Sequence, residues 1–208
     1  MWRKHKVFCI GYNKTGTTSL AKALKELGYR VGVQADAERL MDDWAVRDFR
    51  RIVRYCRTAD AFQDVTFSVE FTYQILDYAF PGSKFILTVR NSPEEWLESF
   101  RRFLGKMFRT AEPPTVDQVK SSRYDGEGWM WRLVQNVYGV DEANFQDTSI
   151  FKAHYEDHNG RVLEYFRRRP ADLLVLNLAD PLSMKSLCEF LGIECAGQVM
   201  PHKNKSTD

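Results

Sequence analysis

The chain of 208 residues is long enough for one α/β domain with a substantial core and too short for two full ones. Its 30 Lys and Arg against 28 Asp and Glu leave a net charge of only +2, which gives no argument for a nucleic-acid partner. The four cysteines have neither CxxC nor Cys/His metal spacing, and the first apolar run is far too short for a signal peptide or a membrane span. We therefore expect no metal, no membrane association and a reducing, cytoplasmic location.

A loop near the N-terminus carries the clearest functional signal. Residues 7–10 are an apolar run typical of a buried strand, and the loop that follows opens at Gly11 and closes at Gly16. Apolar residues at helical spacing then continue as far as Gly28. A strand, such a loop and a helix in this order point backbone N–H groups and a helix N-terminus at a phosphate.

The residues inside this loop indicate which kind of phosphate chemistry to expect. A nucleotide-hydrolysing P-loop has a lysine directly after its second glycine, whereas here Thr17 holds that position and Lys14 is the only lysine in the loop. We expect Lys14 to reach the transferred group from within the loop. The terminal oxygens of that group would be contacted by the hydroxyls of Thr15, Thr17, Thr18 and Ser19.

Strand and helix patterns alternate along the rest of the chain. We predict further strands near 30–33, 61–65, 84–89 and 172–176, and helices over 35–57, 69–80, 93–104, 145–169 and 184–191. This alternation predicts an α/β fold with a central parallel sheet of about five strands in the order 2-3-1-4-5. A single domain over residues 1–208 is expected. Residues 105–140, which such a sheet does not require, would form a helical cap insertion over the acceptor site; alternatively, their aromatic residues only pack the insertion.

Polar residues at two predicted strand ends are further site candidates. Arg90 follows the strand near 84–89, and Ser92 and Pro93 then read as the N-cap and first residue of a helix. A cation at this position could hold a second phosphate. Asp64 ends the third predicted strand at the same sheet edge as Lys14, and it is our first candidate for a general base. The weaker candidates are Asp36, Glu70 and His158, and each of the four also has an ordinary structural explanation as a cap, a surface carboxylate or a packed histidine.

The pattern Tyr12-x-Lys14-Thr15-Gly16-Thr17-Thr18 resembles the 5′-phosphosulfate loop of the sulfotransferases that use 3′-phosphoadenosine 5′-phosphosulfate (PAPS). Further segments, at 155–162, 173–177, 187–192 and 201–204, are similar to the bacterial-type sulfotransferase-domain proteins, so the resemblance covers nearly the whole chain. It implies a three-layer, P-loop-like domain that transfers a sulfuryl group from PAPS, without a metal, to a hydroxyl or amine of a small-molecule or carbohydrate acceptor.

The resemblance also assigns residues to the co-substrate. In the family an arginine at a strand end and a serine eight residues later hold the 3′-phosphate; here Arg90 matches, and Ser99 stands nine residues after it. An extra residue in the turn at 91–92 explains this offset. Lys203 in the basic C-terminal segment would close over the 3′ end. The 5′ end would be held by Asn13, Lys14, Thr15, Gly16, Thr17, Thr18 and Ser19.

Two other functions fit part of the pattern. A P-loop nucleotide or phosphate kinase is opposed by the missing lysine after Gly16 and by the lack of a Walker B acid. A catalytically silent nucleotide-binding protein of the same fold would keep the loop but lose turnover. For the transferase, we predict in-line displacement with Lys14 stabilising the leaving phosphate and Asp64 as the base.

Overall fold

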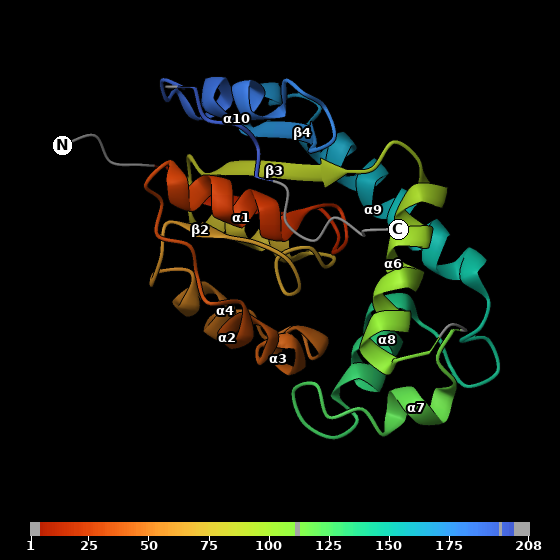
Figure 1. The fold of residues 1–208 in the computed structure, drawn as a ribbon. Helices are drawn as coiled ribbons and strands as arrows, with labels where there is room; N and C mark the ends of the chain where they lie inside the picture. Colours follow the sequence, from red (N-terminus) through yellow and green to blue (C-terminus); the bar gives the residue numbers. More distant parts are fainter. Residues whose placement is uncertain (1–4, 111–112, 196, 202–208) are drawn as a thin grey trace. The chain divides into compact units, whose positions relative to one another are not determined.

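The structure is a computed structural model that describes residues 5–110, 113–195 and 197–201 (Figure 1). The chain divides into two compact units. The first contains the residues up to Arg90 and those from Val162 onward, and the second runs from Asn91 to Arg161.

A parallel sheet forms the centre of the first unit. Its four strands stand in the order β2-β1-β3-β4, and all neighbouring pairs are parallel. The strands are β1 (Val7–Cys9), β2 (Ala61–Phe62), β3 (Lys84–Val89) and β4 (Leu173–Asn177). The predicted α/β class with a central parallel sheet is confirmed.

The prediction of about five strands is wrong by one strand. The segment near 30–33 contributes only an isolated bridge, in which Val31 pairs with Ala61 at the outer edge of β2. The pairing stops there because Val33 already serves as the N-cap of the next helix, and its carbonyl accepts a hydrogen bond from the Tyr55 hydroxyl at 2.7 Å. The observed order therefore equals the predicted one with its edge strand removed.

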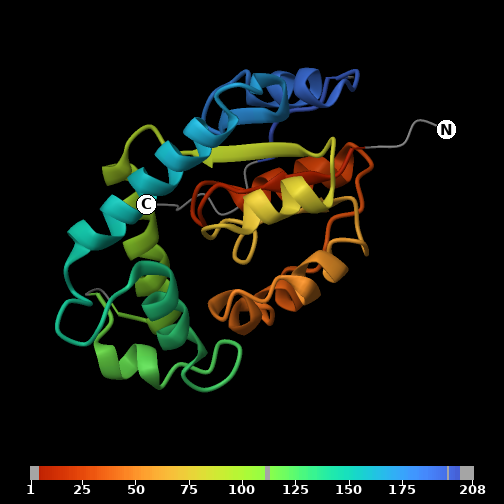
Figure 2. The same cartoon turned by 180° about the vertical axis from the view of Figure 1, so that it is seen from behind.

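Helices cover both faces of this sheet. Figure 1 shows α1 in front of the strands, and Figure 2, from behind, shows α5 on the opposite face. The side chains of β1 alternate accordingly: Val7 and Cys9 belong to the core cluster that includes apolar residues of α1 and α10, whereas Phe8 packs against the ring of Phe85 at 5.6 Å. The helices that begin in this unit are α1 (Thr17–Glu26), α2 (Gln34–Glu38), α3 (Met41–Ala45), α4 (Arg50–Tyr55), α5 (Thr72–Ala79), α10 (Ser183–Leu191) and the short 3₁₀ helix η1 (Pro170–Asp172).

The single helix predicted over 35–57 is wrong, because this stretch forms the three short helices α2, α3 and α4. Between α3 and α4 the backbone of Arg47 adopts a positive φ of 60°, which an α-helix does not permit. Trp44 in α3 is 2% exposed and donates from its indole nitrogen to the carbonyl of Glu70 at 2.8 Å. This buried anchor fixes α3 at an angle that a straight helix could not reach.

A disulfide bond connects Cys188 of α10 to Cys195, with 5.8 Å between their Cα atoms. The sequence spacing of seven residues gave no sign of this bond. Cys188 is 2% exposed, so its side chain is also part of the core. Because disulfides persist mainly in oxidising compartments, the predicted reducing location receives no support from this pair.

The second unit is helical throughout its regular structure. Its helices are α6 (Pro93–Phe108), α7 (Val116–Lys120), α8 (Trp129–Tyr138) and the larger part of α9 (Thr148–Phe166), which continues into the first unit. Aromatic side chains form its core; the rings of Trp96 and Tyr155, for example, are stacked with centroids 4.7 Å apart. This packing extends the compact unit to 91–161, well beyond the insertion predicted at 105–140. Within the described ranges of both units, we find no helix with the length and hydropathy needed to cross a membrane.

Candidate functional site

The loop between β1 and α1 begins with a close approach between two backbones. A Cβ atom at Gly11 would lie 2.2 Å from Oγ1 and 2.4 Å from the carbonyl oxygen of Thr88 in β3. Real Cβ atoms do not approach backbone this closely, so only glycine fits here. The loop therefore starts directly against the neighbouring strand.

Hydroxyl groups fasten the middle of the loop to β3. The Thr15 side chain donates to the carbonyl of Tyr12 within the loop, and its oxygen lies 2.6 Å from Oγ1 of Thr88. Thr15 and Thr88 are 2% and 0% exposed, so this hydrogen bond is shielded from water. The Thr88 hydroxyl is also 3.7 Å from the Sγ atom of Cys9, and burial raises the pKa of Cys9 to about 12. Cys9 is therefore an inert part of the floor under the loop and not a nucleophile.

The loop ends at the N-terminus of α1. Gly16, the N-cap, has a φ of 102°, and a Cβ atom there would lie 2.8 Å from a methyl group of Leu178. Because glycine has no side chain, it cannot cap the first N–H groups of the helix, which are left to bind an anion. Of the two threonines that follow, Thr17 is buried and Thr18 is exposed.

Lys14 is held in place through its backbone. Its φ of 66° is uncommon for a residue with a side chain, and its carbonyl accepts a hydrogen bond of 2.8 Å from Nε of Arg90, one residue beyond β3. Sequence reasoning assigned Arg90 to a second phosphate. The structure adds a contact that the sequence did not reveal, in which this arginine supports the loop that carries Lys14.

Asp64 lies beside the loop, two residues after β2. Its Oδ2 accepts a hydrogen bond from the Thr17 hydroxyl at 2.6 Å, and its Oδ1 accepts one from the backbone N–H of Val65 at 2.9 Å. Burial raises the pKa of Asp64; these hydrogen bonds and the positive charge of Lys14 act in the opposite direction but do not cancel it. The carboxylate is therefore more basic than an ordinary aspartate.

The other predicted site residues are located as follows. Ser19 is buried in the first turn of α1, and Ser99 lies on α6 in the second unit, so its predicted role with Arg90 stays a prediction. Lys203 is outside the described residues. The Ser92 side chain caps α6 as expected, accepting from the N–H of Glu95 at 3.1 Å.

The weaker candidates for a general base lie elsewhere in the described structure, and their role stays a prediction. The carboxylate of Asp36 pairs with Arg39 at 3.4 Å, and the backbone carbonyl of Glu70 accepts the hydrogen bond of Trp44. His158 is 2% exposed in α9. Within the ranges that the structure describes, no three acidic, histidine or cysteine side chains gather to hold a metal ion.

Sequence reasoning missed Thr88. This residue lies under the loop, where its hydroxyl bonds to Thr15 and its backbone touches Gly11. The available signal was a hydroxyl residue inside the otherwise apolar strand 84–89, because a buried polar group in a core strand needs a specific partner.

Fold and site together define a class of protein: a parallel α/β protein whose strand–loop–helix junction carries a lysine and several hydroxyl side chains. The chain belongs to the sulfotransferase-domain family, whose model matches residues 6–208. The family places it among the transferases, as the sequence predicted. A search of curated proteins finds no match.

Proposed function

We propose that this protein transfers a sulfuryl group from PAPS to a hydroxyl or amine acceptor. The observation that carries the proposal is the position of Lys14 inside the loop between β1 and α1, next to the N-terminus of α1. The family match over residues 6–208 supports the same reaction. PAPS would supply the sulfuryl group: its bond to the 5′-phosphate oxygen breaks as a bond to the acceptor forms, leaving 3′-phosphoadenosine 5′-phosphate.

The residues present fit a 5′-phosphosulfate. The first N–H groups of α1, that of Thr17 included, and the hydroxyl of Thr18 would bind the phosphate oxygens, since the N-cap Gly16 has no side chain to cap those N–H groups. The Thr17 hydroxyl donates its one proton to Asp64. Lys14 would place its ammonium group against the leaving oxygen and neutralise the charge that develops there. Arg90 keeps the Lys14 backbone in place and, with Ser99 and Lys203, is proposed to hold the 3′-phosphate.

Asp64 is proposed as the general base that takes the proton of the acceptor. Both of its oxygens already accept one hydrogen bond, which orients the carboxylate and leaves each oxygen a further lone pair. Its raised pKa makes this carboxylate a stronger proton acceptor than an ordinary aspartate. The rate should therefore fall as the pH is lowered through this pKa, because only the ionised form accepts a proton.

Replacing Asp64 with asparagine should abolish most turnover and change how the stability of the protein depends on pH. Since the pKa of Asp64 is raised in the folded state, its contribution to stability is present at low pH and is lost as the pH rises through the folded pKa. The asparagine side chain does not titrate, so the Tm of the variant relative to that of wild type should rise as the pH rises through the folded pKa of Asp64. Calorimetry and a PAPS turnover assay measure both effects.

Asp36→Asn is the matched control, because Asp36 was also a candidate base but lies in an exposed ion pair with Arg39. It should leave turnover and Tm nearly unchanged. Full turnover in Asp64→Asn would remove Asp64 from the mechanism.

Calorimetric titration distinguishes the proposed donor from the kinase alternative. We expect 3′-phosphoadenosine 5′-phosphate to bind at least about tenfold more tightly than ATP with Mg²⁺, because the loop lacks the lysine after Gly16 on which a P-loop kinase depends. Tighter binding of ATP with Mg²⁺ would favour the kinase and contradict the proposal.

A further inference from the structure

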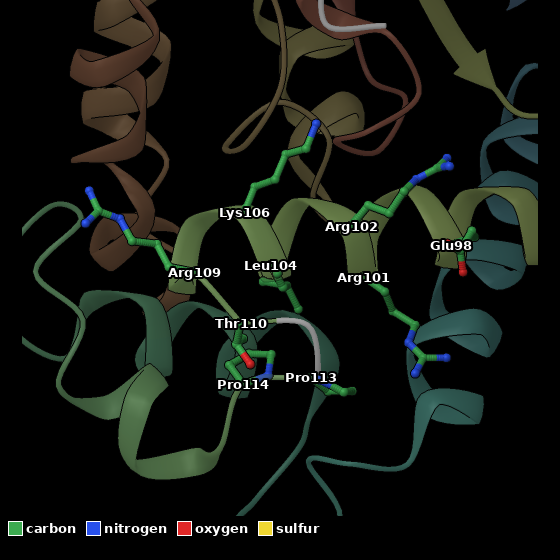
Figure 3. Close-up of a pocket in the computed structure, with 10 residues that line it drawn as sticks. Glu98, Arg101, Arg102, Leu104, Lys106, Arg109, Thr110, Pro113 and Pro114 are labelled. Atoms are coloured by element: carbon green, nitrogen blue, oxygen red, sulfur yellow. The ribbon is translucent and has the colours of Figure 1, made fainter. Parts of the chain in front are cut away.

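A basic cavity lies at the end of α6, within the second unit (Figure 3). Its volume is about 520 Å³, within the range of small-molecule sites. Four of the lining side chains are cations: Arg101, Arg102, Lys106 and Arg109. Among the lining residues that the structure describes, Glu98 is the one acidic residue, and the uncharged part is formed by Leu104, Gly105, Thr110, Pro113 and Pro114.

The helical spacing of α6 places Gly105 in the middle of this face. Figure 3 shows Arg102 and Lys106 extending from one edge of the helix and Arg101 from the other. A Cβ atom at Gly105 would lie 2.9 Å from the carbonyl oxygen of Thr110, so the absence of a side chain lets the backbone of Thr110 pack against the helix here. The cavity is bounded by cations on both sides.

The side chains of these four cations make no hydrogen bond or ion pair with any residue in the described part of the chain. Other cations of the same unit do: Lys120 pairs with Glu142, and Lys152 pairs with Glu94 at 3.0 Å. The whole chain has a net charge of only +2, so four such charges around one cavity are a local concentration.

The helix dipole explains only part of this concentration. Cations are favoured in the last turn of a helix, where α6 has Lys106. Arg101 and Arg102 lie further upstream, where the dipole effect has fallen away. Guanidinium groups are the donors that best match the paired oxygens of carboxylate, sulfate and phosphate.

We propose that this cavity binds an organic anion: a small molecule with a carboxylate, sulfate or phosphate group on an uncharged body that contacts Leu104 and the two prolines. This inference goes beyond the proposed function and does not depend on it. Binding itself requires no donor and can be measured separately.

The binding test uses two matched probes, 4-nitrophenyl β-D-glucuronide and 4-nitrophenyl β-D-glucoside, which differ in a carboxylate. The glucuronide should bind at least about tenfold more tightly, and added salt should weaken it because exposed charges are screened. Arg102→Gln/Lys106→Gln should reduce its affinity about tenfold and leave the glucoside unaffected. Equal affinity of the two probes, or an unchanged affinity in the variant, would overturn the site.

Arg54→Gln/Arg57→Gln is the control with the same loss of charge. Both residues are exposed in or just after α4 of the first unit and should change glucuronide affinity less than about twofold. An equal loss in both double variants would mean that overall charge, and not the cavity, attracts the anion.

Discussion

Replacing Lys14 with alanine should lower the kcat of sulfuryl transfer by about 10²–10³-fold, the loss seen when one preorganised donor to a developing charge is removed. The ammonium group of Lys14 is proposed to neutralise the leaving phosphate, and no other lysine lies in the loop. The fold should survive, because the loop is fastened by Thr15 and Thr88 and by the carbonyl of residue 14, all of which the variant keeps.

The control is Lys25→Ala on the exposed side of α1, which removes the same charge away from the loop. Its kcat should stay within about twofold of wild type, and both variants should unfold at nearly the same temperature as wild type. Undiminished kcat in Lys14→Ala would refute the role of this lysine. Wild-type protein that binds 3′-phosphoadenosine 5′-phosphate but transfers nothing would instead favour the silent nucleotide-binding protein.

Replacing Gly11 with alanine should destabilise the protein by about 3 kcal/mol, at the upper end of the range for overpacking. The new methyl group would overlap the backbone as well as the side chain of Thr88, and a strand at the centre of the sheet cannot move aside. Denaturant unfolding measures the loss. Donor binding should weaken too, since the loop would be displaced from β3.

Gly160→Ala provides the comparison, because a Cβ atom in that part of α9 would meet no other atom within 4 Å. In an open helical position alanine should stabilise by about 0.5–1 kcal/mol. If Gly11→Ala were equally harmless, the close approach of the loop to β3 would not exist in solution.

The loop and the strands at the centre of the sheet could be predicted because their signals are local. Two glycines at fixed spacing, an apolar strand before them and a helix after them define the junction without reference to distant residues. Ser92 and Pro93 mark the start of α6 in the same way, through a cap whose partner is three residues away.

The features that the sequence predicted wrongly or missed depend on contacts between residues far apart in the chain. No glycine or proline interrupts residues 35–57, so local propensity favoured one helix, and only the burial of Trp44 against the segment of Glu70 breaks it. The bond of Thr17 to Asp64 joins residues 47 positions apart, and that of Thr15 to Thr88 joins residues 73 apart. The basic cavity could not be predicted from the sequence either. In the sequence its cations look like an ordinary solvated helix face, and only the fold shows that Thr110 lies against Gly105.

The buried pair of Thr15 and Thr88 has a consequence for affinity. A flexible loop that closes around a phosphate loses conformational entropy on binding, and that loss weakens the complex. Here the fold itself has already ordered the chain from Gly11 to Gly16, through a hydroxyl pair that water does not reach and a carbonyl held by Arg90. The loop therefore needs little further ordering when the proposed donor binds, so little of the contact energy with its phosphate is lost to conformational entropy.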